Sequence, residues 1–182
     1  MNQLFFFKNF LRDGRIASMV PTAERAVRQI CSSLDFRRDL MVVEYGPGEG
    51  VFTRYLLSRL TPRSRLLVID TNPIFVTALR QIGDHRLEVI SGDIRLADQL
   101  LTRRGVDSVD HVLSGIPFSF LSGTERARVT LITAGLVVAG GSFILYQFSP
   151  LMRRYLAPVF KEVQLSFVPL NLPPLFVMKA IK

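Results

Sequence analysis

The chain has 182 residues with a net charge of +8, and 48% of its residues are hydrophobic, which suits one folded domain and excludes extensive disorder. No apolar run reaches the ~20 residues of a membrane-spanning helix, because pairs of glycines at 140–141 and prolines at 173–174 interrupt the longest ones. The positive charge predicts a polyanionic partner, either nucleic acid or anionic lipid, unless it serves solubility alone.

Residues 1–37 predict a mostly helical lead-in, and residues 38–182 predict the main domain. Within the lead-in, residues 3–12 place apolar side chains at helical spacing beside basic ones. This pattern is typical of an amphipathic helix that lies flat on anionic lipid, and the alternative is that the phenylalanines cover the core. The residues concerned are Leu4, Phe5, Phe6, Phe7, Lys8, Phe10, Leu11, Arg12 and Arg15, with Arg153, Arg154 and Lys161 extending the basic face. A second helix is expected from about Pro21 to Leu34.

From Leu40 onward, apolar runs alternate with helical patterns, which predicts an α/β fold with helices on both faces of a mainly parallel sheet. Seven strands are expected. They are predicted at 41–45, 65–70, 86–91, 109–113, 142–148, 160–168 and 175–181, with helices at 50–60, 73–82, 94–103, 124–138 and 151–156.

The first predicted strand of the main domain ends in a glycine-rich loop. Three glycines at alternate positions, Gly46, Gly48 and Gly50, follow the strand, and a helical pattern comes next. The second strand ends at Asp70, where a β-α-β unit that binds a nucleotide-like ligand would hold a ribose hydroxyl. An ordinary turn rich in glycine and proline is the alternative, but the surrounding strand and helix favour a cofactor site.

The spacing of the glycines bears on the identity of the cofactor. A dinucleotide site expects Gly-x-Gly-x-x-Gly, which would place the third glycine at Val51 instead of Gly50. The order Glu44-x-Gly46-x-Gly48-x-Gly50 resembles motif I of the S-adenosylmethionine-dependent methyltransferases. We therefore expect S-adenosyl-L-methionine in preference to a dinucleotide.

The other strand ends supply the remaining candidate cofactor contacts, because ligands in open parallel sheets bind beyond the carboxyl ends of the strands. Asp70 would accept from the ribose hydroxyls, and Asp93 from the adenine amino group, with Ile94 against the ring. A helix N-cap is the alternative role for Asp93. Glu44 would orient the glycine loop and, through water, the cofactor's ammonium. The expected cofactor-binding residues are Glu44, Gly46, Gly48, Gly50, Asp70, Thr71, Asp93, Ile94 and Ser114.

Several motifs along the whole chain resemble those of the bacterial phospholipid N-methyltransferase family. They are the aromatic-basic start at 5–13, Val20-Pro21-Thr22, the glycine loop at 44–53, Asn72-Pro73-x-Phe75-Val76, Ser114-Gly115-Ile116-Pro117 and Asn171-Leu172-Pro173-Pro174. The resemblance implies a Rossmann-like class I methyltransferase fold whose last strand is antiparallel. It also implies a cytoplasmic enzyme, peripheral on the inner face of the membrane, that methylates the amine of phosphatidylethanolamine and its mono- and dimethyl derivatives.

Methyl transfer to an amine requires a neutral nitrogen, alignment and exclusion of water. Burial beside a positive sulfonium lowers the pKa of an amine, whose ordinary value is ~10. We expect Tyr45, Ser114 and Tyr146 to bind or orient the head group, although a packed core tyrosine is the alternative for each aromatic ring. His85 and His111 are interpreted as structural, and the scarcity of cysteine and histidine argues against a metal site.

Two other functions stay open. The stretches Ile116-Pro117-Phe118 and Gly92-Asp93-Ile94 are also similar to the ribosomal RNA adenine dimethyltransferases. However, Gly115 stands where that family has an asparagine, and the chain ends at Lys182 with no helical domain for RNA, so a nucleic-acid partner is not expected. A lipid-binding module without catalytic activity is the third hypothesis, and absence of cofactor binding would favour it.

Overall fold

The structure is a computed structural model that describes residues 20–168 and 174–182. Its helices are α2 (Val20–Cys31), α3 (Val51–Arg59), α4 (Pro73–Arg80), α5 (Ala97–Thr102), α6 (Gly123–Leu136) and α7 (Arg153–Leu156), with 3-10 turns η2 (Ile94–Leu96), η3 (Phe118–Phe120) and η4 (Pro150–Met152). Its strands are β1 (Met41–Tyr45), β2 (Arg65–Asp70), β3 (Leu87–Ser91), β4 (Val109–Ser114), β5 (Val137–Gln147), β6 (Glu162–Val168) and β7 (Leu175–Ile181).

The strands form one seven-stranded sheet in the order β3-β2-β1-β4-β5-β7-β6. The first five pair in parallel, and β7 lies antiparallel between β5 and β6. Parallel neighbours require crossover connections, and helices supply them. The expected class I methyltransferase fold, with a mostly parallel sheet and an antiparallel last strand, is confirmed.

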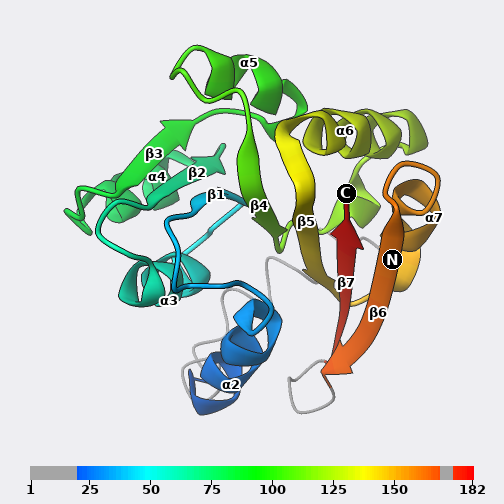
Figure 1. The fold of residues 1–182 in the computed structure, drawn as a ribbon, viewed down its shortest axis with the longest axis horizontal. Coiled ribbons are helices and arrows are strands. Elements are labelled where there is room, and N and C mark those ends of the chain that lie inside the picture. Colours follow the sequence, from blue (N-terminus) through cyan, green and yellow to red (C-terminus); the bar gives the residue numbers. More distant parts are fainter. Residues whose placement is uncertain (1–19, 169–173) are drawn as a thin grey trace.

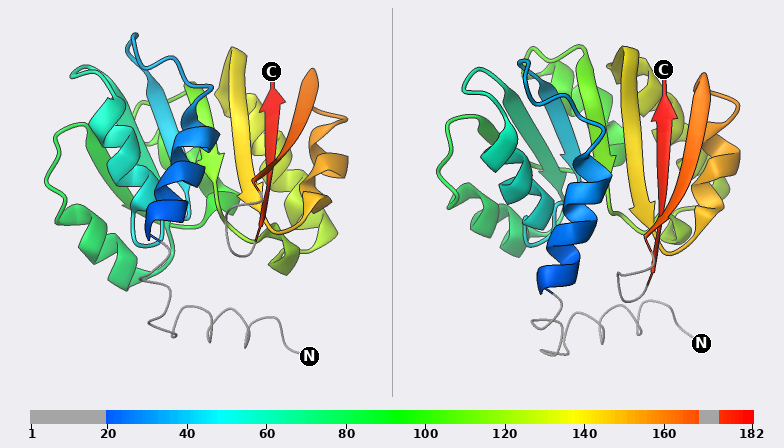
Figure 2. Two further views of the ribbon diagram at one scale, coloured as in Figure 1. Left: turned by 90° about the horizontal axis from the view of Figure 1, so that it is seen from below. Right: turned by 60° about the horizontal axis from the view of Figure 1, so that its bottom comes forward.

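Helices cover both faces of this sheet (Figures 1 and 2). One face packs against α2, α3 and α4, and the other against α5, α6 and α7. In Figure 1, α5 and α6 lie above the sheet, whereas α2 and α3 lie below it. Because β1 and β2 are buried on both faces, their sequences are mostly apolar runs. The carboxyl ends of the parallel strands therefore meet at one edge, between the two helical layers.

Most element bounds differ from the sequence prediction by a few residues at most, and two elements differ more clearly. The strand predicted at 142–148 begins at Val137, directly after α6, and it passes through Gly140 and Gly141. Gly140 has φ +77°, and a Cβ at Gly141 would overlap the carbonyl oxygen of Asp110, so the two glycines allow an irregular register against β4 instead of ending the strand. The helix predicted at 94–103 is split into η2 and α5, because the chain turns tightly after its cap at Asp93.

Some predictions fall outside the described residues. These are the interfacial helix at 3–12 and most of the Asn171-Leu172-Pro173-Pro174 element, and the division into a lead-in and a main domain stays a prediction. Across residues 20–168 and 174–182, none of the helices combines the length and the apolar character needed to cross a bilayer. The same residues contain no group of three metal-binding side chains.

Candidate active site

The glycine loop after β1 is anchored to the neighbouring strand β2. Gly46 and Gly48 have φ of +65° and +56°, values that residues with a Cβ rarely adopt. The amide of Gly46 donates to the carbonyl of Ile69 at 2.9 Å, and that of Gly48 donates to Asp70 Oδ2 at 3.3 Å. A Cβ on Gly46 would overlap Ile116, whereas one on Gly48 would meet no protein atom within 4 Å. Gly46 therefore permits close packing, and Gly48 borders open space.

Asp70 ends β2 and is nearly buried, with 9% of its surface exposed. Its Oδ1 accepts from the amide of Asn72 at 2.8 Å, while Oδ2 accepts from Gly48. These bonds fix the carboxylate between the glycine loop and the start of α4. Each oxygen keeps a further acceptor site, so Asp70 can still accept from a ligand hydroxyl.

A cavity of about 530 Å³ opens at this edge of the sheet. This volume lies within the usual range for small-molecule sites, ~300–1,000 Å³. The cavity runs from the glycine loop, past the end of β2, to the loops that follow β3 and β4. Its lining residues are Gly46, Gly48, Glu49, Ile69, Asp70, Thr71, Phe75, Gly92, Asp93, Ile94, Arg95, Gly115, Ile116, Pro117, Phe120, Leu121 and Glu125.

One end of the cavity carries a network of charges. Asp93 caps η2 through the amide of Arg95 at 2.8 Å, and it also accepts from the Arg95 guanidinium. Hydrogen bonds from Arg95 hold the pKa of Asp93 below its ordinary value. Arg95 also donates to Glu125, whose side chain completes a capping box with Ser122 at the start of α6. Asp93 thus has the alternative capping role, and it lines the cavity as well.

Glu44 lies beneath the glycine loop and is fully buried. Thr53 donates to its Oε2 at 2.6 Å, whereas Oε1 has no hydrogen-bond partner in the part of the chain that the structure describes. Burial raises the pKa of Glu44 to about 7; the Thr53 bond lowers it, and Asp70 raises it further. A buried acceptor with free capacity is suited to a donor or cation near the loop. The prediction that Glu44 helps to bind the cofactor stays a prediction.

Tyr146 lies behind the loop that follows β4. A Cβ on Gly115 would stand 2.8 Å from Cζ and 2.9 Å from the hydroxyl oxygen of Tyr146. The Tyr146 ring stacks on Phe52, with a centroid distance of 4.1 Å and an interplanar angle of 14°. Burial raises the pKa of Tyr146 well above its ordinary value of 10, so the phenol is neutral. Because Gly115 lines the cavity, the Tyr146 ring packs directly against a residue of the cavity wall.

Three predicted site residues are placed elsewhere, which corrects their assignments. Tyr45 is fully buried on the α6 side, where its hydroxyl lies 3.3 Å from the hydroxyl of Thr133. Ser114 is also fully buried, and its hydroxyl accepts from the amide of Ile116 at 3.3 Å. Neither residue reaches the cavity surface. Gly50 precedes α3 and approaches Leu79, so it serves packing instead of lining the cavity.

The cavity also contains residues that the sequence analysis missed. They come from α4, η2, η3 and the first turn of α6, and they are Phe75, Arg95, Phe120, Leu121 and Glu125. One signal was available, because Ser122-x-x-Glu125 is a capping-box pattern that marks the start of a helix. Phe75, on α4, belongs to the Asn72-Pro73-x-Phe75-Val76 motif, but the sequence analysis gave it no role at the site.

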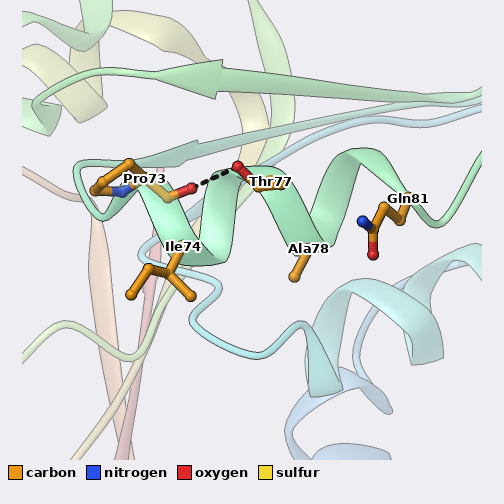
Figure 3. Close-up of a pocket in the computed structure, with 5 residues that line it drawn as sticks. All are labelled: Pro73, Ile74, Thr77, Ala78 and Gln81. Carbon is orange, nitrogen blue, oxygen red and sulfur yellow. Dashed lines mark hydrogen bonds between the residues drawn. The ribbon is translucent and has the colours of Figure 1, made fainter.

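A second, shallow hollow of about 440 Å³ lies along the exposed face of α4 (Figure 3). It is lined by Pro73, Ile74, Thr77, Ala78 and Gln81. The hydroxyl of Thr77 donates to the Pro73 carbonyl at 2.8 Å, within the helix itself. This hollow has no charged side chain in its lining, so the cavity at the strand ends is the candidate active site.

Solved structures identify the class of the fold. N-methyltransferase NodS from Bradyrhizobium japonicum WM9 matches with a TM-score of 0.71 and 12% identity, over 93% of this chain and 98% of that one. The Burkholderia thailandensis 1,6-didemethyltoxoflavin-N1-methyltransferase, solved with S-adenosylhomocysteine, matches with a TM-score of 0.68 and 19% identity, over 96% and 86%. The chain thus has the class I methyltransferase fold. The open space beside Gly48 and the acceptor at Asp70 fit the expected cofactor, S-adenosyl-L-methionine.

A curated relative identifies the family, although no family model matches. Ornithine lipid N-methyltransferase of Singulisphaera acidiphila is 30% identical over 174 residues, which cover 94% of this chain and 91% of that protein. The chain therefore belongs to the bacterial phospholipid N-methyltransferase family that its sequence resembles, and it is an S-adenosylmethionine-dependent N-methyltransferase. Ribosomal RNA small subunit methyltransferase H of Bordetella pertussis is 38% identical over 68 residues, but these cover 36% of this chain and 19% of that protein.

Proposed function

We propose that the protein transfers methyl groups from S-adenosyl-L-methionine to the amine of phosphatidylethanolamine and of its mono- and dimethyl derivatives. The reaction takes place at the cytoplasmic surface of the membrane, where the protein is peripheral. The observation that carries this proposal is the similarity to ornithine lipid N-methyltransferase over 94% of the chain. Both acceptors are amines on membrane lipids, and a net charge of +8 favours an anionic lipid surface.

The cavity has two chemically different parts, which suit the two substrates. Asp70 and Asp93 supply carboxylates for the ribose and adenine of the cofactor. Ile116, Pro117 and Phe120 form an apolar wall at the other side of the opening. An apolar wall excludes water, and exclusion of water favours the neutral form of an amine. The methyl sulfonium of the bound cofactor supplies the electrophile.

Tyr146 is the side chain that we assign to orienting the amine. Its neutral hydroxyl makes no side-chain hydrogen bond with any residue in the described ranges, and its ring packs against Gly115 in the cavity wall. A neutral phenol can accept a hydrogen bond from the N–H of the neutral amine in phosphatidylethanolamine and in its monomethyl derivative, whereas the dimethyl amine has no N–H and can only pack against the ring. The amine nitrogen is thereby held while its lone pair faces the methyl group.

The decisive experiment incubates the full chain with methyl-labelled cofactor and three separate acceptors. These are phosphatidylethanolamine vesicles, ornithine lipid vesicles and protein-free ribosomal RNA. Label in phosphatidylethanolamine at the highest kcat/KM supports the proposal. A preference for ornithine lipid would overturn the choice of head group, and label in RNA alone would overturn the lipid substrate.

Two further measurements complete this test. Tyr146→Phe should lower kcat, since the amine loses its acceptor, and leave the Kd for the cofactor unchanged. Glu162→Gln is the control. Glu162 is the first residue of β6, at the edge of the sheet opposite to the cavity, so this variant should keep full activity. Absence of cofactor binding by calorimetry would favour a lipid-binding module without catalytic activity.

A further inference from the structure

The outer end of the sheet exposes apolar side chains on β6. Leu165 and Phe167 are 42% and 48% exposed. Side chains alternate along a strand, so both share a face with Val163, which packs against the core on the α6 and α7 side. The last helix on this side, α7, has four residues, and Leu165 and Phe167 stay exposed beside it. Exposed large apolar groups that lie side by side mark an interaction surface.

These apolar groups lie at the same edge of the sheet as the cavity. Phe167 pairs with Phe176 on β7, and their ring centroids are 5.2 Å apart. Phe176 in turn pairs with Gln147 at the end of β5. The side-chain amide of Gln147 donates to the carbonyl of Ile116, a residue of the cavity wall. The apolar surface and the cavity opening are thus connected through two strands.

Positive charge lies beside the start of α6, where a Cβ on Gly123 would stand 3.4 Å from the hydroxyl of Tyr155. Arg126 and Arg154 both donate to the hydroxyl of Tyr155, at 3.4 and 3.0 Å. Neither they nor Arg153 pair with a carboxylate in the described part of the chain. The nearby Glu125 is engaged by Arg95.

Between residues 115 and 168 the sequence has five basic and two acidic residues. One of those acids, Glu162, begins β6 and therefore lies at the end of the strand that is far from Phe167. Two guanidinium groups that converge on one neutral hydroxyl repel each other, and an anion close to them relieves this repulsion.

The combination of apolar and basic groups discriminates between possible occupants. A second copy of the chain would bring the same arginines together, which like-charge repulsion disfavours. A nucleic acid would use the arginines but would leave Leu165 and Phe167 without a role. An anionic phospholipid interface takes up aromatic and aliphatic side chains and attracts arginine at the same depth.

We propose that the β6 patch, defined as Leu165, Phe167 and Phe176 with Arg153 and Arg154, docks on an anionic phospholipid bilayer. The apolar residues insert at the level of the head groups, and the two arginines pair with lipid phosphates. This orientation turns the opening of the cavity toward the membrane. The role of this orientation in catalysis rests on the proposed function. The membrane contact itself is predicted whatever the methyl acceptor is.

The chain contains no tryptophan, so a single indole introduced by substitution reports on its own surroundings. In Phe167→Trp, emission should move to shorter wavelength on addition of phosphatidylglycerol vesicles, and brominated lipid should quench it. The control is Leu131→Trp, because Leu131 is 60% exposed on α6. Its emission should stay unchanged. Equal shifts at the two positions, or none at position 167, would overturn the proposal.

Sedimentation with vesicles tests the charges. Arg153→Gln combined with Arg154→Gln should weaken binding to phosphatidylglycerol vesicles about tenfold at low salt, since each cation near an anionic surface contributes to binding. Arg103→Gln, on an exposed side chain after α5, is the control and should lose about half as much or less. An equal loss of vesicle binding in the double variant and in Arg103→Gln would overturn the proposal. It would also be overturned if the wild type were a dimer and the double variant a monomer.

Activity separates this inference from the proposed function. With water-soluble short-chain phosphatidylethanolamine, the double variant should keep the kcat of the wild type, whereas with vesicles its rate should fall. Failure of every protein to methylate either lipid would refute the proposed function alone. The fluorescence and sedimentation results would still decide the membrane contact.

Discussion

The close contact between Gly115 and Tyr146 leads to a specific prediction for Gly115→Ala. The new Cβ would overlap Cε2 of Tyr146 and would stand 2.8 Å from Cζ, whereas an ordinary contact is about 3.5 Å, so the ring must move by about 1 Å. Phe52 stacks on the ring at 4.1 Å and restricts its movement. Gly115 has no positive φ, so the backbone itself accepts alanine.

The expected change in stability combines two opposing contributions. Overpacking in a filled core costs about 1–3 kcal/mol. Replacement of glycine by alanine at an unstrained position stabilises by about 0.4–1 kcal/mol through the unfolded chain. The net loss is about 1–2 kcal/mol, or roughly 3–6 °C in Tm for a chain of this size.

Urea unfolding and thermal melting measure this change, and Gly135→Ala supplies a matched control. Gly135 lies inside α6, and a Cβ there meets no atom within 4 Å. That variant should therefore gain up to about 1 kcal/mol. In a double-mutant cycle with Tyr146→Leu, the cost of Gly115→Ala should shrink by at least about 0.5 kcal/mol. A Gly115→Ala protein as stable as the control, or additivity in the cycle, would refute the reasoning.

Three further substitutions test the buried charges and the cofactor site. Because the pKa of Glu44 rises from 4.5 to about 7 on folding, the native state binds more protons between these values. Stability should then fall by roughly 3 kcal/mol as pH rises through this window, and Glu44→Gln should abolish the fall in urea titrations. Burial lowers the pKa of His111 from 6.5 to about 4, so its contribution to stability disappears as pH falls through that window. His111→Asn should reduce this acid sensitivity, as melting at pH 4 and pH 7 would show. Asp70→Asn should weaken cofactor binding about tenfold or more by calorimetry, because a charged acceptor is lost; an unchanged Kd would contradict its assignment to the ribose.

The bounds of β1 and β2 could be predicted to the residue because both strands are buried on two faces. Such strands are mostly apolar runs. β1 ends directly before the glycine loop at Gly46, and β2 ends with Asp70 as its last residue. The same reasoning identified Asp70, whose place follows from the end of β2. Local sequence was sufficient for these features, since the features themselves are local.

The misassigned site residues show where local sequence is insufficient. Tyr45 follows Glu44 directly, so the two side chains point to opposite faces of β1. The face on which Tyr45 is buried depends on Thr133, which is 88 positions away. Similarly, Gly115 and Tyr146 are separated by 31 positions, and only the pairing of β4 with β5 brings them together. Neither contact leaves a periodic signal in the sequence.

The end of β5 explains how a change at the outer strands can reach the cavity. Tyr146 and Gln147 are consecutive, so they lie on opposite faces of the sheet. Tyr146 packs against Gly115 from one face, while Gln147 donates to the Ile116 carbonyl from the other. The loop after β4 is thus held on both sides by one strand, whose last residue also pairs with Phe176. A displacement of Phe176 that moves Gln147 therefore acts on Ile116, and the cavity wall responds close to Gly115 and Tyr146, where we propose that the acceptor amine is aligned.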